Sequence, residues 1–151
     1  MKNKKIVILE NIRSCHNVGA IFRTADGAGF DEVVLTGYTP APPDRRIEKV
    51  SLGAENFIKW RQLENTAALI SDLKKQNFKI CALEQTPKSK NIFSVKLPKT
   101  NFALVLGNEV EGVSPEVLAL ADDHFEIPML GKKSSLNVSV AAGVAFFRFS
   151  N

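Results

Sequence analysis

Residues 127–149 read IPMLGKKSSLNVSVAAGVAFFRF, and the fold of the chain is inferred outward from this stretch. A short apolar strand end comes first, then a polar loop around Gly131, then a long segment whose only charge is Arg148. Ser135 and Asn137 stand where the loop enters a predicted helix, and capping that helix explains one of them. A loop that brings main-chain N–H groups, hydroxyls and an amide to a helix start is also suited to a polar ligand.

The helix predicted from residue 137 to residue 149 is apolar on more than one side. One side carries Val138, Ala141, Ala142, Ala145 and Phe149, and another carries Val140, Val144 and Phe147. A helix of this composition is expected to be buried all round. In a chain of 151 residues, a second subunit is the expected cover for one of these sides.

Upstream of this stretch, short runs rich in β-branched residues alternate with helical patterns. Strands are predicted at residues 5–9, 33–35, 57–60, 79–83, 102–106 and 125–127, and residues 86–100 are predicted to be irregular. The helices between them are predicted to begin at a cap formed by Asn17, at Arg45, at a cap formed by Thr66, and at Ser114 followed by Pro115. This alternation predicts one α/β domain over residues 1–151, with a mostly parallel sheet flanked by helices.

Composition and net charge exclude few classes of function. The net charge of +4 and the pI near 9.1 are weak signs of a polyanionic partner. Cys15 and Cys81 are expected to be free thiols, and neither they nor His16 and His124 have the spacing of a metal site, so no metal is expected. The apolar run at residues 6–9 is too short for a signal peptide or a membrane span. We therefore expect a cytoplasmic protein without a membrane partner.

Two further segments carry candidate site residues. Gly107 directly follows a predicted buried strand, which lets a ligand approach the main chain, and it puts Glu109 at the carboxyl end of the sheet. Asn17 and Arg23 lie six residues apart, so they converge only if Asn17 is in the loop or at the cap. The simpler interpretation is a capping asparagine and a surface arginine. Neither a Rossmann fingerprint nor a P-loop sequence is present.

Taken together and in this order, the three segments resemble the motifs of the SpoU/TrmH branch of the SPOUT RNA methyltransferases. The matching patterns are N-x5-R from Asn17 to Arg23, LGNE-x2-G from Leu106 to Gly112, and IPM-x-G-x3-SLN from Ile127 to Asn137. The resemblance covers nearly the whole chain. It implies an α/β fold with a C-terminal deep trefoil knot, and transfer of a methyl group from S-adenosylmethionine to a ribose 2′-hydroxyl of tRNA or rRNA.

The resemblance also implies roles for individual residues. The methyl donor would be held mostly by main-chain groups of Leu106, Gly107, Ile127, Met129, Leu130 and Leu136. The catalytic set would be Arg23, Asn17, Glu109, Ser135 and Asn137. Arg23 would act as general base, or would hold an RNA phosphate and stabilise the developing alkoxide. Deprotonating an arginine near pH 7 costs on the order of 7 kcal/mol or more, which disfavours the first role. A homodimer through the first and last helices is implied as well.

RNA recognition would rest on the domain itself, because the chain starts almost at its first strand, whereas many relatives carry an N-terminal RNA-recruiting domain. The expected phosphate contacts are Arg13, Arg45, Arg46 and Lys49. The chain departs from the family at Cys15-His16, where relatives often have Asp-Pro. Two alternatives stay open at this point: a non-catalytic RNA-binding or assembly protein of the same fold, and a SPOUT enzyme that methylates a base.

Overall fold

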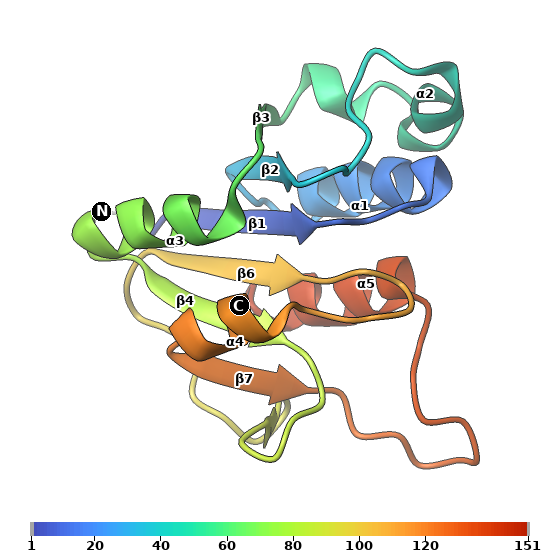
Figure 1. The fold of residues 1–151 in the computed structure, drawn as a ribbon. Coiled ribbons are helices and arrows are strands. Elements are labelled where there is room, and N and C mark those ends of the chain that lie inside the picture. Colours follow the sequence, from blue (N-terminus) through green and yellow to red (C-terminus); the bar gives the residue numbers. More distant parts are fainter. Residues whose placement is uncertain (1, 151) are drawn as a thin grey trace.

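A computed structural model of the chain describes residues 2–150, and a seven-stranded parallel sheet forms its centre (Figure 1). The strands are β1 (Lys5–Glu10), β2 (Glu32–Thr36), β3 (Lys59–Leu63), β4 (Lys79–Leu83), β5 (Lys90–Asn91), β6 (Phe102–Leu106) and β7 (Asp123–Glu126). Their order in the sheet is β3-β2-β1-β6-β4-β7-β5, and every pairing is parallel. The predicted α/β class with a parallel sheet is confirmed.

The sequence located the central strands better than the edge strands. β6 and β4 have the predicted bounds. FALVL is buried along its whole length, and KICAL is buried at its three central residues. The prediction of a strand at residues 57–60 was wrong in its bounds: Phe57 ends the short helix η1 (Ala54–Asn56), and β3 begins at Lys59. The last strand likewise lies at Asp123–Glu126 and not at 125–127, and the segment predicted to be irregular contains the short strand β5.

The helices are α1 (Cys15–Gly27), α2 (Arg45–Ser51), α3 (Thr66–Lys75), α4 (Pro115–Leu120) and α5 (Val138–Arg148). Two predicted caps were wrong. Ser14, not Asn17, caps α1, with its side chain accepting from the Asn17 N–H; Asn65, not Thr66, caps α3. The predicted Ser114 cap with Pro115 behind it is confirmed, and Asn137 caps α5.

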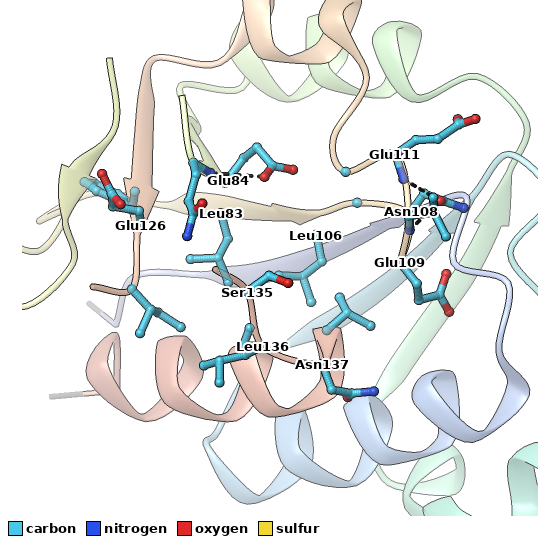
Figure 2. A pocket seen from close by; sticks show the side chains of 18 of the residues that line it. Leu83, Glu84, Leu106, Asn108, Glu109, Glu111, Glu126, Ser135, Leu136 and Asn137 are labelled. Atoms are coloured by element: carbon cyan, nitrogen blue, oxygen red, sulfur yellow. Dashed lines mark hydrogen bonds between the residues drawn. The ribbon is translucent and has the colours of Figure 1, made fainter. Parts of the chain in front are cut away.

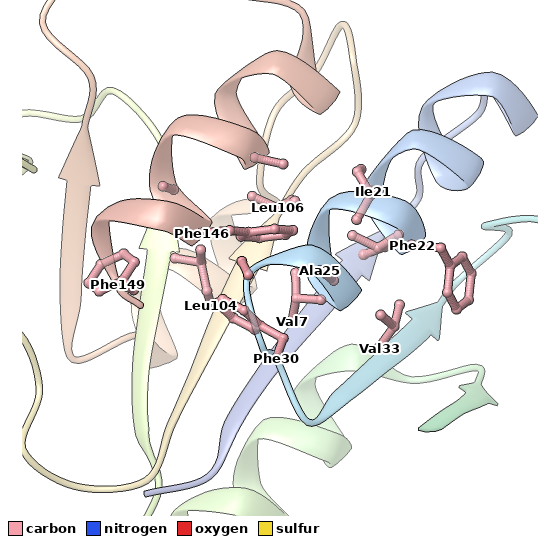
Figure 3. Packing of buried hydrophobic residues seen from close by; sticks show 14 of the residues in the cluster. Val7, Ile21, Phe22, Ala25, Phe30, Val33, Leu104, Leu106, Phe146 and Phe149 are labelled. Carbon is pink, nitrogen blue, oxygen red and sulfur yellow. The ribbon is translucent and has the colours of Figure 1, made fainter. Parts of the chain in front are cut away.

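The helices cover the two faces of the sheet separately. One apolar cluster packs α1 and α5 against β1, β2 and β6 (Figure 3), and the other packs α3 and α4 against the opposite face. Phe146 of α5 is fully buried, and its ring centroid lies 4.6 Å from that of Phe30. Truncating such a side chain to alanine typically costs about 3–5 kcal/mol. The chain therefore crosses from the α4 face to the α5 face after β7, through the loop at residues 127–137.

Within one protomer, helix α5 is buried on one side and partly exposed on another, and the predicted cover by a second subunit stays a prediction. Ala142, Ala145 and Phe146 are buried, whereas Val140 and Phe147 are 53% and 54% exposed. These two exposed apolar side chains lie on the side that the sequence left for a second subunit. No helix within residues 2–150 is long and apolar enough to cross a membrane.

Candidate functional site

A pocket of about 480 Å³ lies at the carboxyl edge of the sheet (Figure 2). The loops after β4, β6 and β7 form three of its walls, and the segment that enters α5 forms the fourth. Of the residues predicted to bind the methyl donor, five line the pocket: Leu106, Gly107, Ile127, Met129 and Leu136. The sixth, Leu130, does not line it, and this residue is 95% exposed.

Gly107 allows the loop after β6 to fold tightly against the pocket. A Cβ atom at this position would lie 2.2 Å from the main-chain N of Val113 and 2.3 Å from the carbonyl carbon of Gly112. Asn108 and Gly112 close the same loop with two main-chain hydrogen bonds of 3.1 and 2.9 Å. Any side chain at Gly107 would push this closed loop away from the strand, so glycine is required by space.

Glu109 links the loops after β1 and β6. Its Oε1 accepts a hydrogen bond from the Arg13 N–H at 2.9 Å, and its Oε2 accepts from the Ser14 N–H at 2.9 Å and from Asn17 Nδ2 at 3.0 Å. Burial acts to raise the pKa of this carboxyl, but the hydrogen bonds outweigh burial and hold the pKa below its ordinary value. Glu109 is therefore an anchored carboxylate and a poor proton acceptor.

Asn17 and Asn137 continue the connection toward α5. Asn137 Nδ2 donates to Asn17 Oδ1 at 3.3 Å, so a single polar chain runs from Glu109 through Asn17 to Asn137. Asn137 also caps α5, since its Oδ1 accepts from the Ser139 N–H at 2.9 Å. The capping role and the site role expected for this region are therefore combined in one side chain. Ser135 lines the pocket beside it.

Arg23 is not brought to the pocket within one protomer. Asn17 and Arg23 both lie inside α1, six residues apart, and Arg23 is exposed while Asn17 is buried. The condition for their convergence, an Asn17 outside the helix, is not met. If Arg23 acts at this site, it must reach the site of another subunit.

The predicted RNA contacts lie on two segments, the loop after β1 and helix α2. Arg13 is exposed, and its main chain is fixed by Glu109. Arg45, Arg46 and Lys49 lie on α2, which packs against α1. Arg46 already has an anionic partner, because its guanidinium forms a 2.9 Å ion pair with Asp44.

Sequence reasoning found Glu109 but missed the other carboxylates of the pocket. The ionisable residues that line it are all carboxylates: Glu84, Glu109, Glu111 and Glu126. Glu84 accepts from the Val113 N–H at 2.9 Å and so joins the loops after β4 and β6. The only feature of the sequence that could have indicated Glu84 as a pocket residue is its position directly after β4. Carboxylates around an apolar floor suit a small cationic ligand with an apolar ring system.

Known proteins give a consistent comparison. The SpoU rRNA Methylase family matches residues 4–147. A tRNA (guanosine(18)-2′-O)-methyltransferase of Aquifex aeolicus is 34% identical over 143 residues, which are 94% of this chain and 66% of that one. A 23S rRNA (guanosine-2′-O-)-methyltransferase RlmB of Xanthomonas axonopodis pv. citri is 35% identical over 142 residues, 94% of this chain and 56% of that one. The chain thus spans between about half and two thirds of these relatives.

Solved structures agree with this comparison. The TrmH/SpoU tRNA modifying enzyme of A. aeolicus superposes with a TM-score of 0.88 at 30% identity, over 99% of this chain and 75% of that one. An AdoMet-bound rRNA methyltransferase from Sinorhizobium meliloti superposes with a TM-score of 0.91 at 26% identity, over 98% and 56%. These superpositions confirm the predicted fold class. The C-terminal knot that the resemblance implies stays a prediction.

Proposed function

Because the chain belongs to the SpoU rRNA methylase family, we propose that it transfers a methyl group from S-adenosylmethionine to a ribose 2′-hydroxyl of tRNA or rRNA. The observation that carries the proposal is the polar chain Glu109–Asn17–Asn137 beside the pocket at the carboxyl edge of the sheet. Ligands of open α/β sheets bind at this edge.

The pocket has the chemistry that this donor needs. Leu106, Ile127 and Leu136 offer apolar surface for an adenine ring, and the space kept free at Gly107 lets the ring approach the main chain. The four pocket carboxylates favour a ligand that carries a sulfonium and an ammonium group. When bound, the donor supplies an electrophilic methyl group.

The residues of the polar chain position the reacting groups. Glu109 fixes the Asn17 side chain, and Asn17 fixes the amide of Asn137 at the end of the pocket. A hydroxyl must be aligned with the bond to the methyl group, and such alignment contributes a large part of the barrier reduction in transfers between two bound molecules. Ser135 and Asn137 are the side chains we assign to the junction of donor and acceptor.

Arg23 is assigned to the site of the partner subunit in a homodimer. Arg23 lies on α1, which packs against α5, and α5 presents Val140 and Phe147 to solvent. A dimer built on α1 and α5 would cover these side chains and bring Arg23 toward the partner's pocket. There its guanidinium would hold an RNA phosphate and stabilise the negative charge that develops on the ribose oxygen.

The RNA would contact Arg13, Arg45, Arg46 and Lys49 through its phosphates, and the cytoplasm, where tRNA and rRNA are found, is the expected location. These contacts supply position and not sequence specificity. Binding should therefore weaken steeply as salt concentration rises.

A labelled methyl-transfer assay tests the proposal. Purified protein is incubated with unmodified tRNA or rRNA and methyl-labelled S-adenosylmethionine, and the digested RNA is analysed by nucleoside. We expect the label on a ribose. A label on a base would support the alternative of a base methyltransferase, and RNA binding without transfer would support a non-catalytic protein.

The Arg23→Ala variant examines the assigned role of Arg23 in the same assay. Removing a group that stabilises transition-state charge is expected to lower turnover by about 100-fold or more. The exposed Lys75→Ala, at the far end of α3, is the matched control and should keep full turnover. Unfolding curves should be the same for all three proteins. An active Arg23→Ala would remove Arg23 from the catalytic set.

A further inference from the structure

We propose that the ring of Tyr38 is a stacking platform for an unpaired base of the RNA substrate, at the edge of the methyl-transfer site. This inference rests on the proposed function and adds a binding residue to it. Tyr38 is the single tyrosine of the chain and follows β2.

Tyr38 is held by hydrogen bonds at its main chain and at its hydroxyl. The Tyr38 N–H donates to Asn11 Oδ1 at 3.1 Å, and the Tyr38 hydroxyl accepts from Asn108 Nδ2 at 2.9 Å. The same Nδ2 donates to the carbonyl oxygen of Asn11 at 2.9 Å. Gly37, with a φ of 62°, is needed for this contact, because a Cβ there would lie 1.8 Å from Asn11 Oδ1. The loops after β1, β2 and β6 are thereby joined around one aromatic side chain.

Although it is fixed, the Tyr38 side chain is 60% exposed. The bond from Asn108 to its hydroxyl restricts the orientation of the ring, yet more than half of the residue stays exposed. A base that stacks on a ring already held in place loses less conformational entropy on binding than one that stacks on a free ring. Sequence-specific proteins read RNA mainly through unpaired bases stacked on aromatic rings.

The position of Tyr38 fits a nucleotide close to the reacting ribose. Its hydrogen-bond partner Asn108 lines the pocket, and the neighbouring residue Glu109 anchors the polar chain to Asn17. Arg13, exposed and two residues after Asn11, can contact a phosphate of the same strand. A ring, a cation and the donor pocket thus lie along one edge, formed by adjacent strands.

Three substitutions separate a stacking role from a structural one. Tyr38→Ala removes the ring, whereas Tyr38→Phe removes only the hydroxyl bonded to Asn108. Phe57→Ala is the matched control, because Phe57 is 80% exposed but precedes the amino end of β3, away from the pocket. Affinity for unmodified tRNA and rRNA is measured by filter binding at low salt, and affinity for S-adenosylmethionine by calorimetry.

Tyr38→Ala should bind RNA about 5- to 100-fold more weakly, the effect of losing one stacked base. Tyr38→Phe keeps the ring but releases it from Asn108, so it should lose clearly less affinity than Tyr38→Ala. Phe57→Ala should stay within about twofold of wild type, and donor affinity should not change. Equal losses in Tyr38→Ala and Tyr38→Phe would mean that the hydroxyl only ties the loops, and unchanged binding by Tyr38→Ala would mean that no base stacks there. Either result overturns the inference while leaving methyl transfer intact. A wild type that binds no RNA would overturn the proposed function as well.

A fluorescent variant reads stacking directly. Trp60 is the single tryptophan, so Tyr38→Trp combined with Trp60→Phe places the only indole at the proposed platform. Adding the RNA should quench its emission if a base stacks on it. A bound complex with unquenched emission contradicts the inference.

Discussion

Asn137 caps a helix and joins the polar chain beside the pocket through two different atoms. Its Oδ1 caps α5, and its Nδ2 donates to Asn17. The sequence could identify Asn137 as a residue at a helix entrance, because its polar neighbours precede an apolar run. It could not assign the direction of each amide atom, since that depends on Asn17, 120 residues away in the chain.

The two roles of Asn137 can be separated by substitution. Asn137→Asp keeps an oxygen cap, because aspartate and asparagine cap helices about equally well, but it loses the donor to Asn17. We expect stability close to wild type and methyl transfer lowered by about tenfold or more. Asn137→Ala should lose transfer and also about 0.5–2 kcal/mol of stability. Urea unfolding and the transfer assay measure the two effects; an Asn137→Asp variant with full activity would contradict the role of the amide.

The hydrogen bonds of Glu109 predict that the stability of the fold depends on pH. Its pKa is below the ordinary value in the folded protein, so its bonds stabilise the fold above the unfolded pKa of about 4.3 and this contribution is lost as the pH falls through the folded pKa. Glu109→Gln should therefore be less stable than wild type at pH 7, and the difference should narrow below about pH 4. Urea unfolding at both pH values tests this; a difference independent of pH would argue against a charged Glu109.

At the scale of elements, the pattern of apolar residues predicted the strands and helices well where burial alone determines where the element lies. It misplaced caps and edge strands, because those depend on which side chain reaches which N–H group. Ser14 and Asn65 cap α1 and α3 in place of the predicted Asn17 and Thr66. Moving the cap of α1 to Ser14 puts Asn17 inside the helix and so turns Arg23 away from it.

The packing of α1 on α2 depends on Gly19. A Cβ there would lie 2.5 Å from the carbonyl oxygen of Ile47 and 2.9 Å from Val50 Cβ. Gly19→Ala should force α2 away and destabilise the protein by about 1–3 kcal/mol. Gly143→Ala in α5 is the matched control, since its Cβ would lie 3.7 Å from Thr24 Cγ2, and it should stabilise the helix by about 0.5–1 kcal/mol. Thermal unfolding ranks the variants, and equal stabilities would refute the packing argument.

At the scale of the molecule, the predicted α/β class followed from the alternation of elements, but the strand order did not. Nothing in the local pattern of FALVL says that β6 lies between β1 and β4. The site depends on that order, since the loops after β1 and β6 meet at Glu109. The candidate site residues were predicted from the resemblance to a family. The residue pattern by itself predicted only that a ligand would bind at the carboxyl edge of the sheet.

The assigned homodimer can be tested through the exposed face of α5. Phe147→Glu should place a charge in the subunit contact and give monomers in sedimentation experiments, where wild type is expected to be dimeric. Phe57→Glu, also an exposed phenylalanine, should stay dimeric. A monomeric wild type would count against the assignment.

Complementation tests whether Arg23 acts across the dimer. Coexpressed Arg23→Ala and Asn137→Asp chains should regain about a quarter of wild-type activity, because half of the random dimers contain one intact site. If Arg23 acted within its own subunit, the mixture would show no more than the residual activity of the two variants expressed alone.

The position of β6 in the middle of the sheet has a consequence for synthesis on the ribosome. β1 and β2 emerge first and can pair, but the other edge of β1 must wait for the strand that begins at Phe102. At a synthesis rate of 5–20 residues per second, the delay between the end of β2 and Phe102 is roughly 3–13 seconds. Apolar segments collapse far faster, within microseconds. Through that interval one edge of the strand KIVILE stays unpaired and exposed to other chains nearby.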